Sequence, residues 1–77
     1  MKEEYMKCLG ANIRYYRLEK GLTQRTLAEA AGVAVSFLND VESGKSNVSI
    51  SWLYQVASIL DVDLSTLFQM IESEVKD

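Results

Sequence analysis

The chain of 77 residues contains no histidine, no proline and a single cysteine, Cys8. Without histidine, acid–base catalysis by imidazole is excluded, and so is the commonest protein metal ligand. One cysteine can form neither an internal disulfide nor a cage of thiolates around a metal ion. The composition therefore predicts no metal site and no cofactor.

The sequence also lacks a long hydrophobic run. No stretch of about 18 consecutive apolar residues occurs, so we expect no membrane-spanning helix. Residues 1–9 carry two lysines and two glutamates, which is not the pattern of a secretory signal. We therefore expect a cytoplasmic protein.

An excess of positive charge is absent as well, since the net charge is −3. Residues 1–47 hold seven basic and six acidic residues, a balance of +1, whereas residues 48–77 hold one basic and five acidic, a balance of −4. The acidity lies in the C-terminal part. A weakly basic face on the N-terminal part is permitted but not required.

What is present is an all-α pattern. Hydrophobic residues make up 48% and charged residues 25%, as in a folded domain. Apolar residues recur at three-to-four spacing in five segments, at about 4–20, 24–31, 34–43, 50–60 and 64–75. Thr23, Ser49 and Asp63 are good N-caps, and glycines end the first three segments. We predict one five-helix domain over residues 1–77.

The decisive spacing lies at about 23–43. The second segment is short, and a turn of three or four residues centred on Gly32 separates it from the third. Two helices joined so tightly cross steeply, as in a helix-turn-helix. Ala28 allows their close approach, Gly32 supplies a positive φ, and Val33 reaches the core. A generic small helical bundle with the same turn is the alternative.

Caps, glycines and apolar positions fall in one register over most of the chain. The first part of this motif is Thr23-Gln24-x-x-Leu27-Ala28-x-x-Ala31-Gly32-Val33, and the second is Leu38-x-x-Val41-Glu42-x-Gly44-Lys45-x-Asn47. A third part follows as Ser49-Ile50-x-x-Leu53-x-x-Val56-Ala57-x-x-Leu60-x-Val62.

This pattern resembles the Cro/C1 (XRE-type) helix-turn-helix domain of phage and bacterial repressors, over roughly residues 9–68. The resemblance implies a five-helix, lambda-repressor-like DNA-binding domain whose third helix enters the major groove. The short length without an added domain is also similar to the controller proteins of restriction–modification systems.

The resemblance implies contacts with the DNA backbone at both ends of the reading unit. Gln24 should meet a phosphate at the start of the second helix, where the helix dipole favours an anion. Thr23 is an N-cap and a backbone contact together, or an N-cap alone. The expected backbone contacts are Thr23, Gln24, Arg25, Lys45, Ser46 and Asn47.

The outward side of the third helix should read bases. Asn39 can pair with adenine, Val35 can touch a thymine methyl, and Asp40 can accept from cytosine. No basic residue stands between Arg25 and Lys45, so the arginine–guanine pairs common on this face are missing. The expected base-reading residues are Val35, Ser36, Phe37, Asn39, Asp40 and Ser43.

Arg17 and Glu42 match an ion pair of the same family that links the first helix to the end of the third. Arg17 stands four residues after Ile13, and Glu42 directly follows Val41, so both can flank the core. We expect the pair to orient the third helix more than to stabilise the fold. The alternative is two separate solvated charges.

The segments at about 50–75 carry more apolar residues than one core needs. Trp52 and Ile59 stand seven apart, away from the expected core face, and a large exposed apolar patch usually marks an interface. We expect a two-fold homodimer through these segments, although Trp52 can instead close the core. The expected interface residues are Trp52, Ile59, Phe68 and Ile71.

The sequence therefore favours a sequence-specific, DNA-binding transcriptional regulator that binds double-stranded DNA as a homodimer on a palindromic operator. The alternative is a protein–protein interaction module on the same fold, such as an antirepressor or an antitoxin subunit. An enzyme is disfavoured, because Cys8 has no histidine to activate it and the carboxylates form no convergent pair.

Overall fold

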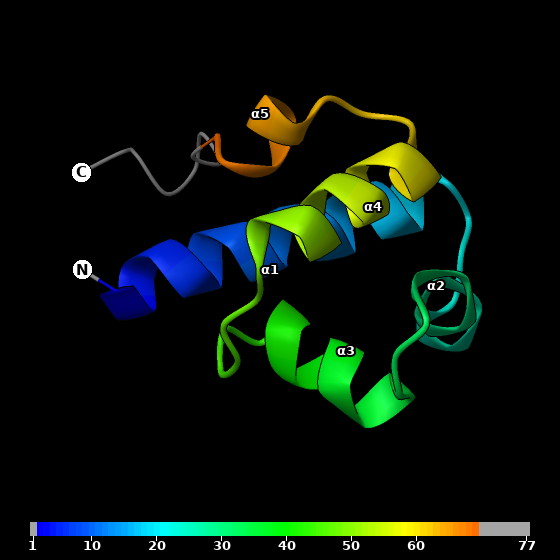
Figure 1. The fold of residues 1–77 in the computed structure, drawn as a ribbon, viewed down its shortest axis with the longest axis horizontal. Helices are drawn as coiled ribbons and strands as arrows, with labels where there is room; N and C mark the ends of the chain where they lie inside the picture. The colour runs from blue at the N-terminus through cyan, green and yellow to red at the C-terminus, as the bar shows by residue number, and fades with distance from the viewer. Residues whose placement is uncertain (1, 70–77) are drawn as a thin grey trace.

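The computed structural model describes residues 2–69, and these residues form five α-helices and no strand. The helices are α1 (Lys2–Glu19), α2 (Gln24–Ala31), α3 (Val35–Glu42), α4 (Ile50–Leu60) and α5 (Leu64–Leu67). In Figure 1, α5 lies on one side of α1 and α4, and α2 and α3 lie on the other. The all-α fold with five helices is confirmed.

Local capping explains where the central helices begin. The hydroxyl oxygen of Thr23 accepts from the backbone N–H of Thr26 at 3.0 Å, and that of Ser49 accepts from Trp52 at 3.1 Å. Each bond satisfies one of the N–H groups that a helix start leaves without a partner. The expected side-chain cap at Asp63 is not formed.

The last expected helix is wrong in its extent. α5 ends at Leu67 and does not continue towards residue 75, and residues 70–77 lie outside the described part of the chain. The backbone N–H groups of Phe68 and Gln69 donate to the carbonyls of Ser65 and Thr66, three residues back. Such bonds tighten and close a last helical turn, so the chain leaves the helix direction here.

The turn between α2 and α3 is built as its glycine predicts. Gly32 has φ 72° and ψ 32°, the left-handed region in which a glycine carries no steric cost. The backbone N–H of Val33 donates to the carbonyl of Ala28 at 3.0 Å, which closes the end of α2. Ala28 is buried against the core and Val33 is half-buried beside it.

One core joins all five helices. Its largest fully buried side chains come from α1 to α5. Because every helix contributes to this core, the inner side of α3 packs against apolar residues, while its outer side is exposed. These side chains are Ile13, Leu27, Leu38, Val41, Leu53, Val56, Leu60 and Leu67.

The contact between α1 and α3 is unusually close at Gly10. A Cβ added there would overlap the carbonyl oxygen of Val41 and would lie 2.8 Å from that of Glu42. Only a residue without a side chain allows two helix backbones to approach this far. The end of α3 is thereby fixed against the middle of α1.

Candidate nucleic-acid interface

The outward side of α3 is open in the described part of the molecule. Val35, Ser36, Asn39 and Ser43 are exposed and Asp40 is half-exposed, while Leu38 and Val41 face the core. This is the division between outer and inner sides that the sequence predicts. Polar groups that can meet base edges therefore lie on an accessible helix surface.

Phe37 lies at the seam between α3 and α4. Its ring meets that of Trp52 edge to face, with ring centres 5.7 Å apart and planes at 82°. The side chain of Phe37 is therefore half-buried. Phe37 therefore borders the outward side of α3 rather than standing in its middle.

Arg17 and Glu42 form a buried ion pair. Arg17 Nε donates to Glu42 Oε2 at 2.7 Å and Nη2 donates to Oε1 at 3.1 Å, a two-bond contact typical of arginine and carboxylate. Arg17 Nη1 also donates to the carbonyl of Leu22 at 2.8 Å. The side chains are 8% and 3% exposed, so the alternative of two solvated charges does not hold.

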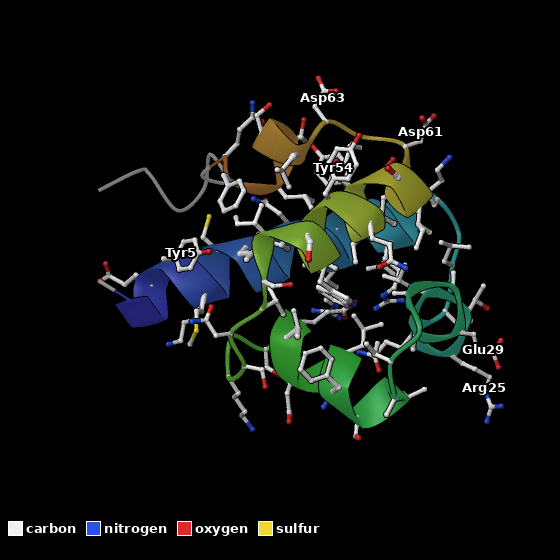
Figure 2. All side chains as sticks on the ribbon, viewed as in Figure 1. Tyr5, Arg25, Glu29, Tyr54, Asp61 and Asp63 are labelled. Atoms are coloured by element: carbon white, nitrogen blue, oxygen red, sulfur yellow. The ribbon has the colours of Figure 1, made fainter. Side chains whose placement is uncertain are left out.

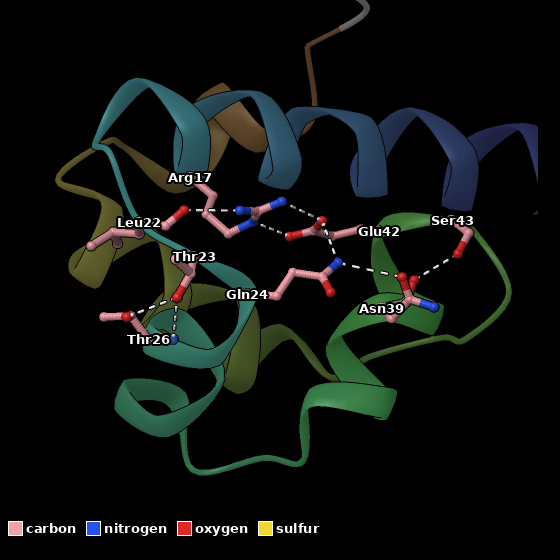
Figure 3. A network of polar contacts seen from close by, with 8 residues as sticks. All are labelled: Arg17, Leu22, Thr23, Gln24, Thr26, Asn39, Glu42 and Ser43. Carbon is pink, nitrogen blue, oxygen red and sulfur yellow. Dashed lines mark hydrogen bonds and ion pairs between the residues drawn. The ribbon is translucent and has the colours of Figure 1, made fainter.

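Gln24 extends this pair onto the outward side of α3, as Figure 3 shows. Its Nε2 donates to Glu42 Oε1 at 3.1 Å and to Asn39 Oδ1 at 3.4 Å. Because a carboxylate only accepts, it decides which end of the Gln24 amide turns towards it. The oxygen of Asn39 then turns towards Gln24, and its Nδ2 faces away.

These bonds change how Gln24 can meet a phosphate. Both hydrogens of its amide nitrogen are engaged inside the protein, so the side chain has only an acceptor left. An anion at this point would be met by the free backbone N–H groups in the first turn of α2.

The other residues expected at the DNA backbone lie on two sides of α3. Arg25 is exposed and points outward from α2 in Figure 2, and Thr23 is exposed beside it. The segment that follows α3 lies at the opposite end of that helix from α2 in Figure 1. In that segment Lys45 and Asn47 are exposed and Ser46 is half-exposed.

Sequence reasoning missed Arg14. Its side chain lines a polar hollow of about 350 Å³ between α1, α2 and α3. The available signal was its spacing, because a residue three positions before Arg17 lies on the same helix face. The hollow is lined by Arg14, Arg17, Gln24, Asn39, Glu42 and Ser43.

The residues expected at a dimer interface differ in how far they are exposed. Trp52 and Ile59 are half-buried against the core, and Trp52 packs on Phe37. Phe68 is 38% exposed and stacks on Tyr5 of α1, with ring centres 6.1 Å apart. Ile71 lies outside the described residues.

Two other apolar side chains of α4 are more exposed than these. Ile50 is 58% and Tyr54 is 65% exposed, and their spacing of four residues places them on one face of α4. Tyr54 also lines a hollow of about 490 Å³ that continues to Leu64 of α5. A sequence search for residues in excess of the core did not single them out.

Within residues 2–69, no helix is long and apolar enough to cross a membrane. Over the same part of the chain, no group of three or more cysteine, aspartate and glutamate side chains is placed to hold a metal ion. The distinctive geometry is therefore that of α2, the Gly32 turn and α3.

A short helix, a tight turn and a second helix with an open polar side define a helix-turn-helix protein, a class built to place one helix against duplex DNA. The helix-turn-helix family HTH_3 matches residues 13–67. The chain belongs to this family, and the resemblance to Cro/C1-type repressor domains is confirmed.

Similar proteins fit this assignment. The chain is 45% identical over 60 residues to the HTH-type transcriptional regulator SinR of Bacillus subtilis, covering 77% of this chain and 54% of SinR. It therefore spans about half the length of that relative.

Two solved structures have the same fold. The restriction–modification controller protein C.AhdI from Aeromonas hydrophila is 36% identical with a TM-score of 0.77, covering 82% of this chain and 96% of that one. A structure of SinR, the master regulator for biofilm formation, in complex with DNA is 44% identical with a TM-score of 0.72, covering 79% of this chain and 98% of that one.

Proposed function

We propose that this protein is a sequence-specific, DNA-binding transcriptional regulator that acts as a homodimer on a palindromic operator. The observation that carries the proposal is the outward side of α3, which is exposed, polar and held at its end by the buried Arg17–Glu42 pair. The relatives named above support it, since SinR is a transcriptional regulator solved with DNA and C.AhdI is a controller protein.

In this proposal α3 lies in the major groove. Asn39 is the main base-reading residue, since an amide can both accept from and donate to adenine, and Ser36 and Val35 lie one turn earlier. Ser43, Asp40 and Phe37 border the contact. Residues about 23–43 form the reading unit.

Backbone contacts fix the register of α3 on the duplex without reading sequence. The start of α2 meets the phosphates on one side, through the side chains of Thr23 and Arg25 and the backbone N–H of Gln24. Lys45, Ser46 and Asn47 meet them on the other. The protein acts by binding and not by catalysis, and it works in the cytoplasm.

A second copy supplies the second half of the site. Two-fold symmetry sets two α3 helices about 34 Å apart, one turn of DNA, which matches a palindrome. We place the contact on α4 and the segment at about 64–75, including Trp52, Ile59, Phe68 and Ile71. The exposed Ile50 and Tyr54 add apolar surface to the same helix.

Binding to DNA upstream of the protein's own gene tests the proposal. Fluorescence anisotropy should show salt-dependent binding, and footprinting should show a protected inverted repeat. Asn39→Ala should reduce discrimination between operator and unrelated DNA by about 1–3 kcal/mol. Tyr15→Phe, at an exposed side chain of α1 outside both the proposed DNA contact and the proposed dimer contact, is the control and should leave this discrimination unchanged.

Sedimentation at micromolar concentration tests the second copy separately. A dimer is expected, and a monomer under all conditions would remove the palindromic part of the proposal. Absence of salt-dependent binding to any genomic DNA would overturn the whole proposal.

A protein–protein module on the same fold is the second candidate. One observation favours it: α3 (Val35–Glu42) has no basic residue and carries Asp40 on its half-exposed side. A stable complex with another protein that blocks α3, together with no binding to DNA, would select this candidate.

A further inference from the structure

The polar hollow between α1, α2 and α3 contains one cation, Arg14, whose charge no described side chain neutralises. Arg14 is exposed and forms no hydrogen bond or ion pair with any side chain between residues 4 and 69. Arg17, on the same helix face, has its guanidinium committed to Glu42 and to the Leu22 carbonyl. Within the described residues, the hollow thus offers the guanidinium of Arg14 with no partner and that of Arg17 with three of its five N–H groups engaged.

The charges of the lining residues favour an anion. Two arginines stand against one glutamate, which leaves a balance of +1. The Glu42 carboxylate is 3% exposed and accepts from Arg17 and Gln24, so its negative charge is already compensated. An incoming anion would therefore meet Arg14 first.

The remaining hydrogen-bond donors of the hollow are few. Both amide hydrogens of Gln24 are used, and the Ser43 hydroxyl donates to the Asn39 carbonyl at 2.6 Å. The Asn39 Nδ2 group and the Arg14 guanidinium are left, together with the second hydrogen of each Nη group of Arg17. Guanidinium is the group that best fits the paired oxygens of a phosphate, while the neutral amide remains for a base edge.

We propose that Arg14 binds a phosphate of the DNA backbone at this hollow, beside Asn39, and so supplies the positive charge that α3 lacks. The inference rests on the proposed function, and it assigns to α1 a direct part in binding. Helix α3 has no basic residue of its own, and the fold places the positive charge of Arg14 beside it.

Arg14→Gln tests the inference in the full chain, with Lys20→Gln as the matched control. Both remove one positive charge from the same part of the chain, but Lys20 lies near Asp61, at 3.9 Å, and lines no part of the hollow. Affinities are measured by fluorescence anisotropy on operator and unrelated duplexes at several salt concentrations. Thermal unfolding of each variant checks that the fold is intact.

Arg14→Gln should weaken binding about tenfold, since a charge-assisted hydrogen bond is lost. The loss should be similar on both duplexes, and the slope of affinity against salt should fall by about 0.9, as expected for one phosphate contact. Arg14→Lys should keep the slope and recover part of the affinity. Lys20→Gln should leave both nearly unchanged.

Equal effects of Arg14→Gln and Lys20→Gln, in a protein that binds DNA with normal salt dependence, would overturn this inference and leave the proposed function standing. If the unmodified protein shows no salt-dependent binding to DNA, the proposed function fails and the inference fails with it.

Discussion

Helix α1 makes two contacts of very different construction. Towards α3 it presents Gly10, which lets two backbones touch, and the buried Arg17–Glu42 pair. Towards α5 it presents Asn12, whose Nδ2 donates to the carbonyls of Leu67 at 2.9 Å and of Gln69 at 2.6 Å. The first contact joins helix to helix, and the second ties a helix to the end of a four-residue turn.

The surroundings of the two contacts differ as well. The charges at the α3 contact are almost fully buried, whereas the Tyr5–Phe68 stack beside the α5 contact is 40% and 38% exposed. The α3 contact combines a two-bond ion pair with the close backbone approach at Gly10, so it fixes the end of α3 against α1. The α5 contact leaves the apolar rings of Tyr5 and Phe68 partly exposed, as the proposed dimer would require.

Glu42→Ala should break the α3 contact most severely. Arg17 and Gln24 would both lose an acceptor, and an unpaired buried guanidinium costs about 3–5 kcal/mol of unfolding free energy. Chemical denaturation measures the loss, and DNA binding should fall with it.

The double variant Arg17→Met, Glu42→Met is the control for this first experiment. A buried pair replaced by apolar side chains of similar size is often neutral in stability. Stability should recover while DNA binding stays impaired, because Gln24 and Asn39 lose their anchor. Unchanged stability and unchanged binding in Glu42→Ala would show that the pair has no structural role.

Gly10→Ala tests the close approach on the same side. The added methyl would meet backbone carbonyls, which cannot turn aside as a flexible side chain can. We expect a loss of about 1–3 kcal/mol or more, although alanine is the better helix former by about 1 kcal/mol. Thermal unfolding gives the sign, and a stabilised variant would contradict the close packing.

Asn12→Ala should have the smallest effect of the three. Two carbonyls would lose a donor, for about 1–3 kcal/mol, but Gln69 is exposed and water can partly replace the amide. Hydrogen exchange should quicken near residues 67–69 while the amides of α3 keep their protection.

Asn39→Ala, at an exposed asparagine, should change the free energy of unfolding by less than about 0.5 kcal/mol.

The central helices were predictable because their signals are local. Thr23, Ser49 and Gly32 act through bonds and torsions within a few residues, so their effect can be read from the sequence. The length of α5 was not predictable in this way. The apolar spacing continues to Ile71, but the helix ends at Leu67. The carbonyl of Leu67 accepts a hydrogen bond from Nδ2 of Asn12, which stands 55 residues earlier in the chain.

Contacts between residues far apart in sequence could not be predicted from local signals. Arg17 and Glu42 were paired from the resemblance to a family, 25 residues apart, and their bonds are formed. Nothing along the chain links Gln24 to Asn39, since these two side chains become neighbours only once α2 and α3 have packed. The spacing of Arg14 and Arg17 puts both on one face of α1, but it does not show that this face borders Asn39 and Ser43.

The order of apolar residues, caps and glycines by itself determined an all-helical chain with a tight turn at Gly32, because hydrophobic period and backbone torsion are properties of neighbouring residues. The packed structure alone decided where α5 stops, which end of the Asn39 amide faces outward and which cation stands beside α3. Those outcomes depend on distances between groups far apart in sequence, and only the closing of the core sets such distances.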